Sequence, residues 1–373
     1  MTFYRWVIRP ILFCFDPEWT HRATLTACQA LGRSALFRNS IEYLYRFEDP
    51  RLHTTIAGIN FKSPVTLAAG FDKDARAVKI MARLHFGALE IGSVSRNPSP
   101  GNPGYPRVWR LPRDNALRIY YGCPNDGADA VAERLKSNRV AVPLGVNLVE
   151  TNTGIRASAE QVSEELSEAI TPFLGLADYL VLNLNCPNVP DGHSALFDDP
   201  VKLALLLESC SRHRNLPPVF LKITPCISED HREIDTILTA VDPFTFVKGF
   251  ILNIPARKPY ALHTPIKELN STCGGLTGPM LRKPTNDAMR NWFSRIDQSR
   301  HALIGVGGIA SAEDAYETIR LGASLVQFYT ALVYQGPSLI KQINRGLCRL
   351  LERDGLRKIG DAVGIDNRVR MTW

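Results

Sequence analysis

The sequence lacks any hydrophobic run long enough to cross a membrane. No apolar stretch approaches the roughly 18 residues that a spanning helix needs, so a membrane-spanning protein is excluded. It also lacks collagen-like repeats, and its 45% hydrophobic and 22% charged residues are the composition of an ordinary soluble globular chain. Disordered chains, fibrous repeats and disulfide-stapled miniproteins are therefore excluded. The length of 373 residues allows two domains or one large barrel with an appendage.

Metal-binding cysteine pairs and a strong charge bias are missing as well. The eight cysteines form no CxxC pair and no cluster with histidine at metal-ligand spacing, which indicates a reducing compartment and no metal site. Lysine and arginine number 44 against 37 acidic residues, a net charge of +7 that is spread along the chain. The densest late cluster, 345–358, alternates with apolar positions like the solvated face of a helix, so no nucleic-acid partner is implied.

The N-terminal residues predict three short helices. Residues 3–15 form the first, with a kink at Pro10, and Asp16-Pro17-Glu18 begins a second that ends near Gly32. A third covers about 35–45. No cleavage site of small residues follows the first segment, so we expect it to be retained. Their apolar faces either meet a membrane surface or a hydrophobic ligand, or pack on a neighbouring domain, and periodicity leaves both alternatives open.

From about residue 60 the pattern changes to eight short apolar runs separated by segments of helical period. Eight buried strands alternating with helices predict a (β/α)8 barrel, with a doubly wound open sheet as the alternative. In a barrel the functional residues follow the C-terminal ends of the strands. The predicted strands are Val65–Ala69, Leu89–Val94, Val140–Val146, Tyr179–Leu184, Val219–Ile223, Gly249–Asn253, Ala302–Val306 and Ser324–Tyr329, and the predicted helices are about 74–85, 126–137, 157–171, 199–212, 229–241, 281–296, 311–321 and 336–352.

Glycines and polar groups gather at these strand ends. Gly307 and Gly308 follow the seventh run and precede a helix, which is typical of a phosphate site, although a glycine-rich turn without a ligand is the alternative. The match of 305–310 to a dinucleotide fingerprint is discounted because it follows a late strand. Lys222 lies inside the apolar run VFLKI, where a lysine is costly unless an anion or hydrogen-bonding ligand offsets it. Together with Lys73 and several amides, these groups favour flavin mononucleotide (FMN) as the cofactor.

At the level of motifs the chain resembles the dihydroorotate dehydrogenases, specifically the membrane-associated, quinone-dependent class. The resemblance covers nearly the whole chain. The N-terminal helical extension indicates the quinone-dependent class, because soluble members of the family lack it. The matching segments are Asp16-Pro17-Glu18 with His21-Arg22, LAAGFDKD (67–74), EIGSV (90–94), PGNPGYPRVWRL (100–111), GVNL (145–148), NCPN (185–188), LKI (221–223), GGLTG (274–278), IGVGGI (304–309) and GASLVQFYTAL (322–332).

This resemblance implies two units and a set of site residues. Residues 1–48 would form a helical unit for membrane contact and quinone access. Residues 49–373 would form the FMN-binding barrel. The protein would be peripheral, on the cytoplasmic side of the cell membrane. Lys73, Asn183, Asn188 and Asn253 would face the substrate, and His21, Arg110 and Tyr329 the quinone route. The residues expected to hold FMN are Ala68, Ala69, Gly70, Asn147, Asn183, Lys222, Gly278, Gly307, Gly308, Tyr329 and Thr330.

The catalytic position departs from the quinone-dependent class. That class has a serine base where this chain has Cys186, whereas soluble classes use cysteine there. A thiol, with an ordinary pKa of about 8.5, loses its proton more readily than a serine hydroxyl, so proton abstraction remains possible. The alternative is an inert buried cysteine.

The substrate loop departs further. Residues 119–124, Ile-Tyr-Tyr-Gly-Cys-Pro, replace an Asn-Arg-aromatic-Gly-Phe-Asn pattern, and Asn253 fills the family's asparagine position only if a one-residue gap falls beside it. Loss of groups built to hydrogen-bond a substrate can change selectivity by orders of magnitude. We therefore expect an FMN-dependent CH–CH dehydrogenase that oxidises dihydroorotate and reduces a quinone. Two alternatives are a paralogue acting on another small cyclic amide in specialised metabolism, and a flavin-binding protein without turnover.

Overall fold

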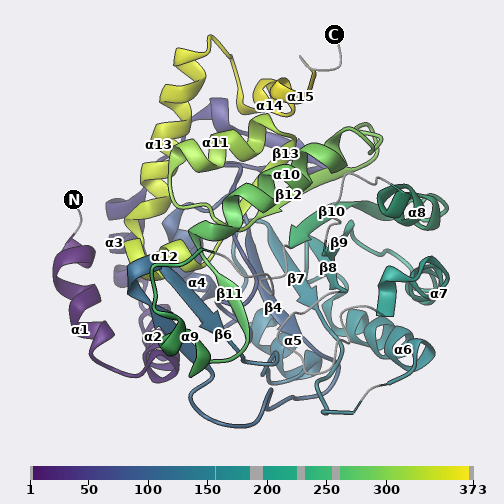
Figure 1. The fold of residues 1–373 in the computed structure, drawn as a ribbon, viewed down its shortest axis with the longest axis horizontal. Coiled ribbons are helices and arrows are strands. Elements are labelled where there is room, and N and C mark those ends of the chain that lie inside the picture. The colour runs from purple at the N-terminus through teal and green to yellow at the C-terminus, as the bar shows by residue number, and fades with distance from the viewer. Residues whose placement is uncertain (1–2, 156, 185–195, 225–231, 254–260, 369–373) are drawn as a thin grey trace.

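Eight parallel strands form a closed barrel surrounded by helices (Figure 1). The computed structural model describes residues 3–155, 157–184, 196–224, 232–253 and 261–368. Around the barrel the strands follow the order β10-β12-β13-β3-β4-β7-β8-β9. The predicted (β/α)8 barrel is confirmed. Its strands are β3 (Val65–Leu67), β4 (Leu89–Val94), β7 (Leu144–Leu148), β8 (Tyr179–Asn183), β9 (Val219–Ile223), β10 (Val247–Asn253), β12 (Ala302–Val306) and β13 (Ala323–Phe328).

The barrel helices fall close to the predicted segments. They are amphipathic, and their apolar sides join one continuous core with the outward-facing side chains of the strands. Their bounds are α4 (Val78–Met81), α5 (Ala128–Lys136), α6 (Ala159–Ile170), α7 (Pro200–Ser211), α8 (Arg232–Val241), α10 (Arg282–Phe293), α11 (Ala312–Arg320) and α13 (Ser338–Arg353), with the shorter α9 (Ile266–Asn270), α12 (Thr330–Gln335), α14 (Ile359–Ala362) and α15 (Ile365–Arg368).

Alternation along the strands divides the barrel interior into an apolar and a polar layer. Side chains two residues apart point to the same face of a strand, so Val181 shares its face with Asn183, and Phe220 shares its face with Lys222. The apolar layer is covered by Ile56 and Phe61, which belong to a hairpin of β1 (Thr54–Ile56) and β2 (Ile59–Phe61). The polar layer lies one step nearer the C-terminal ends of the strands, where the sequence predicts the site.

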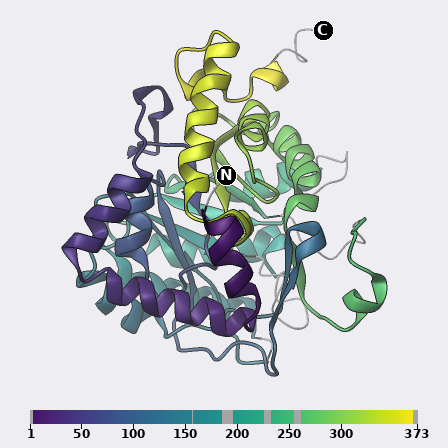
Figure 2. The same cartoon turned by 90° about the vertical axis from the view of Figure 1, so that its left-hand side faces the viewer.

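Three N-terminal helices lie along one side of the barrel (Figure 2). A wide turn, Tyr4–Ile8, leads into α1 (Arg9–Phe13), followed by α2 (Pro17–Leu31) and α3 (Ala35–Tyr45). The Asp16 side chain accepts a hydrogen bond of 2.8 Å from the Trp19 backbone nitrogen, and Pro17 opens the helix, as the sequence predicts. α2 packs on α4 and α3 packs on α13. The division of the chain at residue 48 stays a prediction.

Some sequence-based boundaries are wrong. The third barrel strand begins at Leu144 instead of Val140, because Pro143 and the turn before it interrupt the apolar run. The segment predicted as a helix over 74–85 is helical only from Val78 to Leu84. An antiparallel sheet of β5 (Val108–Leu111), β6 (Ala116–Ile119) and β11 (Gly275–Thr277) is not predicted at all.

In the described part of the chain, no helix combines the length and the apolar character required to span a bilayer.

Candidate active site

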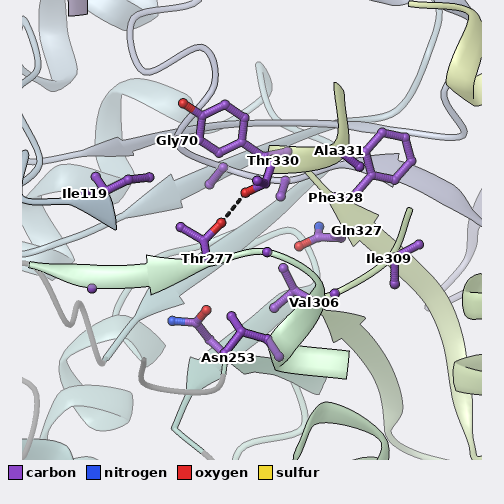
Figure 3. A pocket seen from close by; sticks show the side chains of 18 of the residues that line it. Gly70, Ile119, Asn253, Thr277, Val306, Ile309, Gln327, Phe328, Thr330 and Ala331 are labelled. Carbon is purple, nitrogen blue, oxygen red and sulfur yellow. Dashed lines mark hydrogen bonds between the residues drawn. The ribbon is translucent and has the colours of Figure 1, made fainter. Parts of the chain in front are cut away.

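A cavity of about 370 Å³ opens at the C-terminal ends of the barrel strands (Figure 3). Its walls come from the polar layer of the barrel, from β6 and β11 of the small sheet, and from the loop between β12 and α11. Among the residues predicted from the sequence, those that line it are Ala68, Ala69, Gly70, Lys73, Asn183, Lys222, Asn253, Gly278, Gly307, Gly308, Tyr329 and Thr330.

A buried carboxylate organises the floor of this cavity. Glu90 on β4 is fully buried, and its Oε1 accepts a 2.8 Å hydrogen bond from Asn147 Nδ2 on β7. Its Oε2 accepts a 2.6 Å hydrogen bond from Gln327 Nε2 on β13. The Lys222 ammonium on β9 lies 3.7 Å from the same carboxylate. Glu90 therefore fixes the positions of polar side chains from three other strands, those of Asn147, Gln327 and Lys222. It also supplies the counter-charge that the buried lysine needs.

A second chain of hydrogen bonds runs from Asn147 toward the opening. Ser93 donates to Asn147 Oδ1 at 2.5 Å and accepts from Asn183 Nδ2 at 3.0 Å. Two acceptors remain buried and without a partner in the described structure, Asn183 Oδ1 and Gln327 Oε1, and both residues line the cavity. Because unpaired buried acceptors are costly, this floor is arranged for a ligand that donates hydrogen bonds.

The lining of the cavity is cationic. It includes Lys73, Lys222, Arg5 and Arg9, and no aspartate or glutamate is among the described lining residues. Lys73 Nζ donates to the Gly70 carbonyl at 2.9 Å and lies 4.4 Å from the centre of the Tyr121 ring. Burial lowers the pKa of Lys73, while Asp72 and Asp74 oppose that shift. An anionic ligand would offset the cost of burying Lys73.

Backbone conformation shapes one rim of the cavity. Gly308 has a φ of +74°, and a Cβ there would meet the Arg282 backbone nitrogen at 2.4 Å, so no other residue fits this turn. Gly70 has a φ of +104°, and a Cβ there would point into open space. The hydroxyls of Thr277 on β11 and Thr330 on α12 are hydrogen-bonded to each other (Figure 3). This bond ties the small sheet to the last loop of the barrel.

A second cavity, of about 250 Å³, lies between the N-terminal helices and the barrel. Its lining is mostly apolar, with contributions from Leu12, Phe13, Ile41 and Met81. His21 and Arg110 also line it, and His21 Nε2 and Arg110 Nε are buried without a partner in the described structure. A ligand that accepts hydrogen bonds and is otherwise apolar matches this cavity.

Electrostatics keep His21 neutral in this second cavity. Burial, and secondarily the positive charge of Lys73, lower its pKa to about 3. Arg110 is held by hydrogen bonds to the backbone oxygens of Phe15 at 2.7 Å and Phe13 at 3.4 Å, and its guanidinium lies 4.4 Å from the Phe13 ring centre. At ordinary pH, His21 therefore offers a hydrogen bond without a charge.

The two cavities share a wall. Tyr121 and Tyr329 line both of them. The ring of Phe71 stands 5.8 Å from that of Tyr329 and 5.4 Å from that of His21, edge to face in each case. One layer of aromatic side chains thus separates a cationic cavity from an apolar one.

Comparison with known proteins identifies the architecture. Residues 51–351 match the family model described as dihydroorotate dehydrogenase. The chain belongs to the dihydroorotate dehydrogenase family. It is 37% identical over 362 residues to a dihydroorotate dehydrogenase (quinone) of Halobacterium salinarum, covering 96% of this chain and 99% of the relative. It is 35% identical over 364 residues to the dihydroorotate dehydrogenase (quinone) of Gloeobacter violaceus, covering 98% of this chain and 99% of that relative.

Solved dihydroorotate dehydrogenase structures agree with this assignment. The Eimeria tenella enzyme in complex with ferulenol has a TM-score of 0.75 and 27% identity, covering 90% of this chain and 96% of that one. The ligand-free structure from the same organism has a TM-score of 0.76, also at 27% identity, covering 89% of this chain and 99% of that one. The family resemblance drawn from the motifs is confirmed, and flavin dependence is a general property of this dihydroorotate dehydrogenase family.

Not every predicted residue of the dihydroorotate dehydrogenase site can be located. Cys186 and Asn188 lie outside the described residues. Asn147 does not line the cavity but supports it through Ser93. Sequence reasoning missed Glu90, Ser93 and Gln327. A charged residue inside the apolar run LEIGSV is the same kind of signal that singled out Lys222, and it would have found Glu90.

Proposed function

We propose that this protein binds FMN at the barrel mouth, oxidises dihydroorotate there and passes the electrons to a quinone in the apolar cavity. The observation that carries the proposal is the wall of Tyr121 and Tyr329, with Phe71 packed on Tyr329, that a cationic, hydrogen-bonding cavity shares with an apolar one. An electron carrier in the first cavity would lie one aromatic layer from an acceptor in the second.

The residues that line the first cavity fit FMN. The unpartnered oxygens of Asn183 and Gln327 would accept hydrogen bonds from the flavin ring, Lys222 would stabilise negative charge on the reduced ring, and Gly70 leaves open space beside it. Asn147 would keep Asn183 in position through Ser93. When bound, FMN supplies the hydride-accepting centre that the protein's own side chains lack. The phosphate would lie against Gly307, Gly308, Tyr329 and Thr330, and Ala68, Ala69 and Gly278 would border the cofactor.

The substrate would lie between the flavin and the loop that contains Tyr121. Lys73, Asn183 and Asn253 line this part of the cavity, and Asn188 completes the proposed set. Lys73 is held against Tyr121 and Gly70, so it can pair with an anionic substrate without a large change of rotamer. Cys186 is the proposed base that removes a proton from one substrate carbon while the adjacent carbon gives up a hydride.

A quinone would enter the apolar cavity between α2 and the barrel. A carbonyl oxygen of the quinone would accept a hydrogen bond from Arg110 Nε, which is buried with no partner in the described structure, and the neutral His21 ring would line the same site. Tyr329 would stand between quinone and flavin.

The N-terminal helices would place this entrance at a membrane surface. Among the large apolar side chains exposed in the described chain, all except Tyr105, Ile155, Val201 and Ile266 lie between Phe3 and Leu44. Such a concentration is typical of an interfacial helical surface. We therefore propose a peripheral protein on the cytoplasmic side of the cell membrane, with residues 1–48 as the membrane and quinone-access unit.

A related substrate is the second candidate, because two replaced loop residues line the cavity. Ile119 and Cys123 lie in its wall, where an aliphatic side chain replaces an amide and a thiol replaces an aromatic ring. A small cyclic amide or acid other than dihydroorotate would suit this wall.

Two anaerobic measurements test the proposal on the purified protein. FMN should be released on denaturation, and dihydroorotate should bleach the flavin absorbance within seconds, with colour returning when a soluble quinone is added. Bleaching by a related cyclic amide but not by dihydroorotate would favour the second candidate. Protein that is colourless and does not take up FMN would contradict both, and a flavoprotein bleached by neither would be a binding protein without turnover.

A further inference from the structure

Two arginines from the N-terminal segment line the proposed FMN cavity although they belong to a different part of the fold. Arg5 lies in the turn Tyr4–Ile8 and Arg9 opens α1, whereas the rest of the lining comes from the barrel and the small sheet. Neither arginine has an acidic partner within 4 Å among the described residues. Two unpaired cations four residues apart on one helical segment repel each other unless an anion lies near them.

The contacts of Tyr4 and Arg9 place this segment against α12, beside the proposed phosphate end of the cavity. Arg9 Nη1 donates to the Tyr334 carbonyl at 3.1 Å, and the Tyr4 hydroxyl donates to the Val333 carbonyl at 2.7 Å. Both acceptors are on α12, which begins at Thr330. The Gln335 side chain on the same helix donates to the Ala310 carbonyl at 2.8 Å, and Ala310 closely follows the Gly307–Gly308 turn.

From these contacts we propose that Arg5 and Arg9 pair with the FMN phosphate, so that cofactor binding and docking of the N-terminal segment stabilise each other. The inference rests on the proposed function and adds to it a phosphate clamp made of two units of the chain. Guanidinium groups suit this role because they donate several hydrogen bonds to phosphate oxygens. By linkage, the free energy that docking adds to FMN binding equals the free energy that FMN adds to docking.

Binding of FMN and of riboflavin to the apoprotein tests the clamp, because riboflavin is the same flavin without phosphate. Dissociation constants are measured by quenching of flavin fluorescence. Arg5→Gln should weaken FMN binding about tenfold, as expected for loss of a charged hydrogen bond, and leave riboflavin binding within about twofold. The Arg5→Gln, Arg9→Gln double variant should lose more of the preference for FMN, and Arg5→Lys should retain most of it.

Arg33→Gln is the matched control, because Arg33 is an exposed arginine of the same helical unit and lines neither cavity. It should leave both dissociation constants unchanged. If the double variant keeps the wild-type ratio of FMN to riboflavin affinity, whether or not both affinities fall, the clamp is wrong and the arginines serve docking alone. A wild-type apoprotein that binds neither flavin would instead overturn the proposed function.

Discussion

Glu90 shows how much one charged side chain contributes beneath the active-site cavity. It is fully buried, accepts hydrogen bonds from Asn147 and Gln327, and faces the Lys222 ammonium. Glu90→Gln would leave Lys222 without its counter-charge and replace one acceptor by a donor. We expect the free energy of unfolding in urea to fall by about 3 kcal/mol. Glu133→Gln, at an exposed helix position, is the control and should change it by less than about 0.5 kcal/mol. Equal unfolding curves for the two variants would contradict this account of the floor.

His21 predicts a pH effect of definite sign. Its pKa is lowered from 6.5 to about 3 in the folded protein, by burial first and by Lys73 second. Below pH 6.5 the unfolded chain therefore binds a proton that the folded chain does not, and stability is lost as the pH falls from about 6.5 toward 3.

His21→Leu removes this contribution. Between pH 7 and pH 5 the wild-type protein should lose about 2 kcal/mol more unfolding free energy than the variant, measured by urea denaturation. Comparison with the variant is needed because burial raises the pKa of Asp72 to about 6, which acts in the opposite direction in both proteins. His53→Leu, at an exposed histidine, should follow the wild type. A His21→Leu protein as acid-sensitive as wild type would show that His21 is not buried in its neutral form.

At the scale of elements, the loop between β12 and α11 combines strain with tight packing. Gly308 and Gly355 both have positive φ angles, +74° and +66°, so alanine pays a similar backbone cost at either position. Only at Gly308 would the added Cβ collide with backbone, at Arg282. Gly308→Ala should therefore weaken FMN binding at least tenfold, measured by flavin content and fluorescence titration, because the turn must move. Gly355→Ala should keep its flavin, and loss of flavin from both variants would assign the effect to backbone strain in general.

The same scale shows what could be predicted from the sequence. All eight barrel strands were predicted, because buried parallel strands are short continuous apolar runs bounded by polar segments. The sheet of β5, β6 and β11 was missed, since its strands have three to four residues and two of them flank Asn115 in a tight turn. Pairing of β6 with β11 joins segments about 160 residues apart, which no local pattern reveals. Gln327 was missed for a related reason, because its partner Glu90 lies on another strand, whereas the charge of Glu90 inside an apolar run is a local signal.

At the scale of the whole molecule, exposed apolar side chains and part of the wall of the apolar cavity belong to the same N-terminal segment. The Phe3–Leu44 segment carries most of the exposed large apolar residues and also contributes Leu12, Phe13, His21 and Ile41 to the cavity wall. A quinone dissolved in lipid would reach His21 without crossing water if this surface rests on the bilayer. Under the proposed function, membrane binding is therefore separable from chemistry at the barrel mouth.

A pair of charge substitutions tests that separation. Leu36 and Val201 are each 75% exposed and each is the second residue of a helix, α3 and α7, where glutamate is favourable for the helix dipole. Leu36→Glu places a charge on the surface proposed to meet lipid, whereas Val201→Glu places it on the barrel's outer helices. We expect Leu36→Glu to reduce binding to phospholipid vesicles in a flotation assay by at least about tenfold.

Flavin reduction by substrate should be unchanged in both variants, because neither residue lines the cationic or the apolar cavity. Val201→Glu should float with the vesicles as the wild type does. Equal flotation of all three proteins would remove the N-terminal helices as the membrane surface, and loss of binding in both variants would show that net charge, rather than the place of the charge, controls it. Turnover with a quinone embedded in vesicles should fall in Leu36→Glu alone, since only that variant separates the entrance of the apolar cavity from the lipid that holds the acceptor.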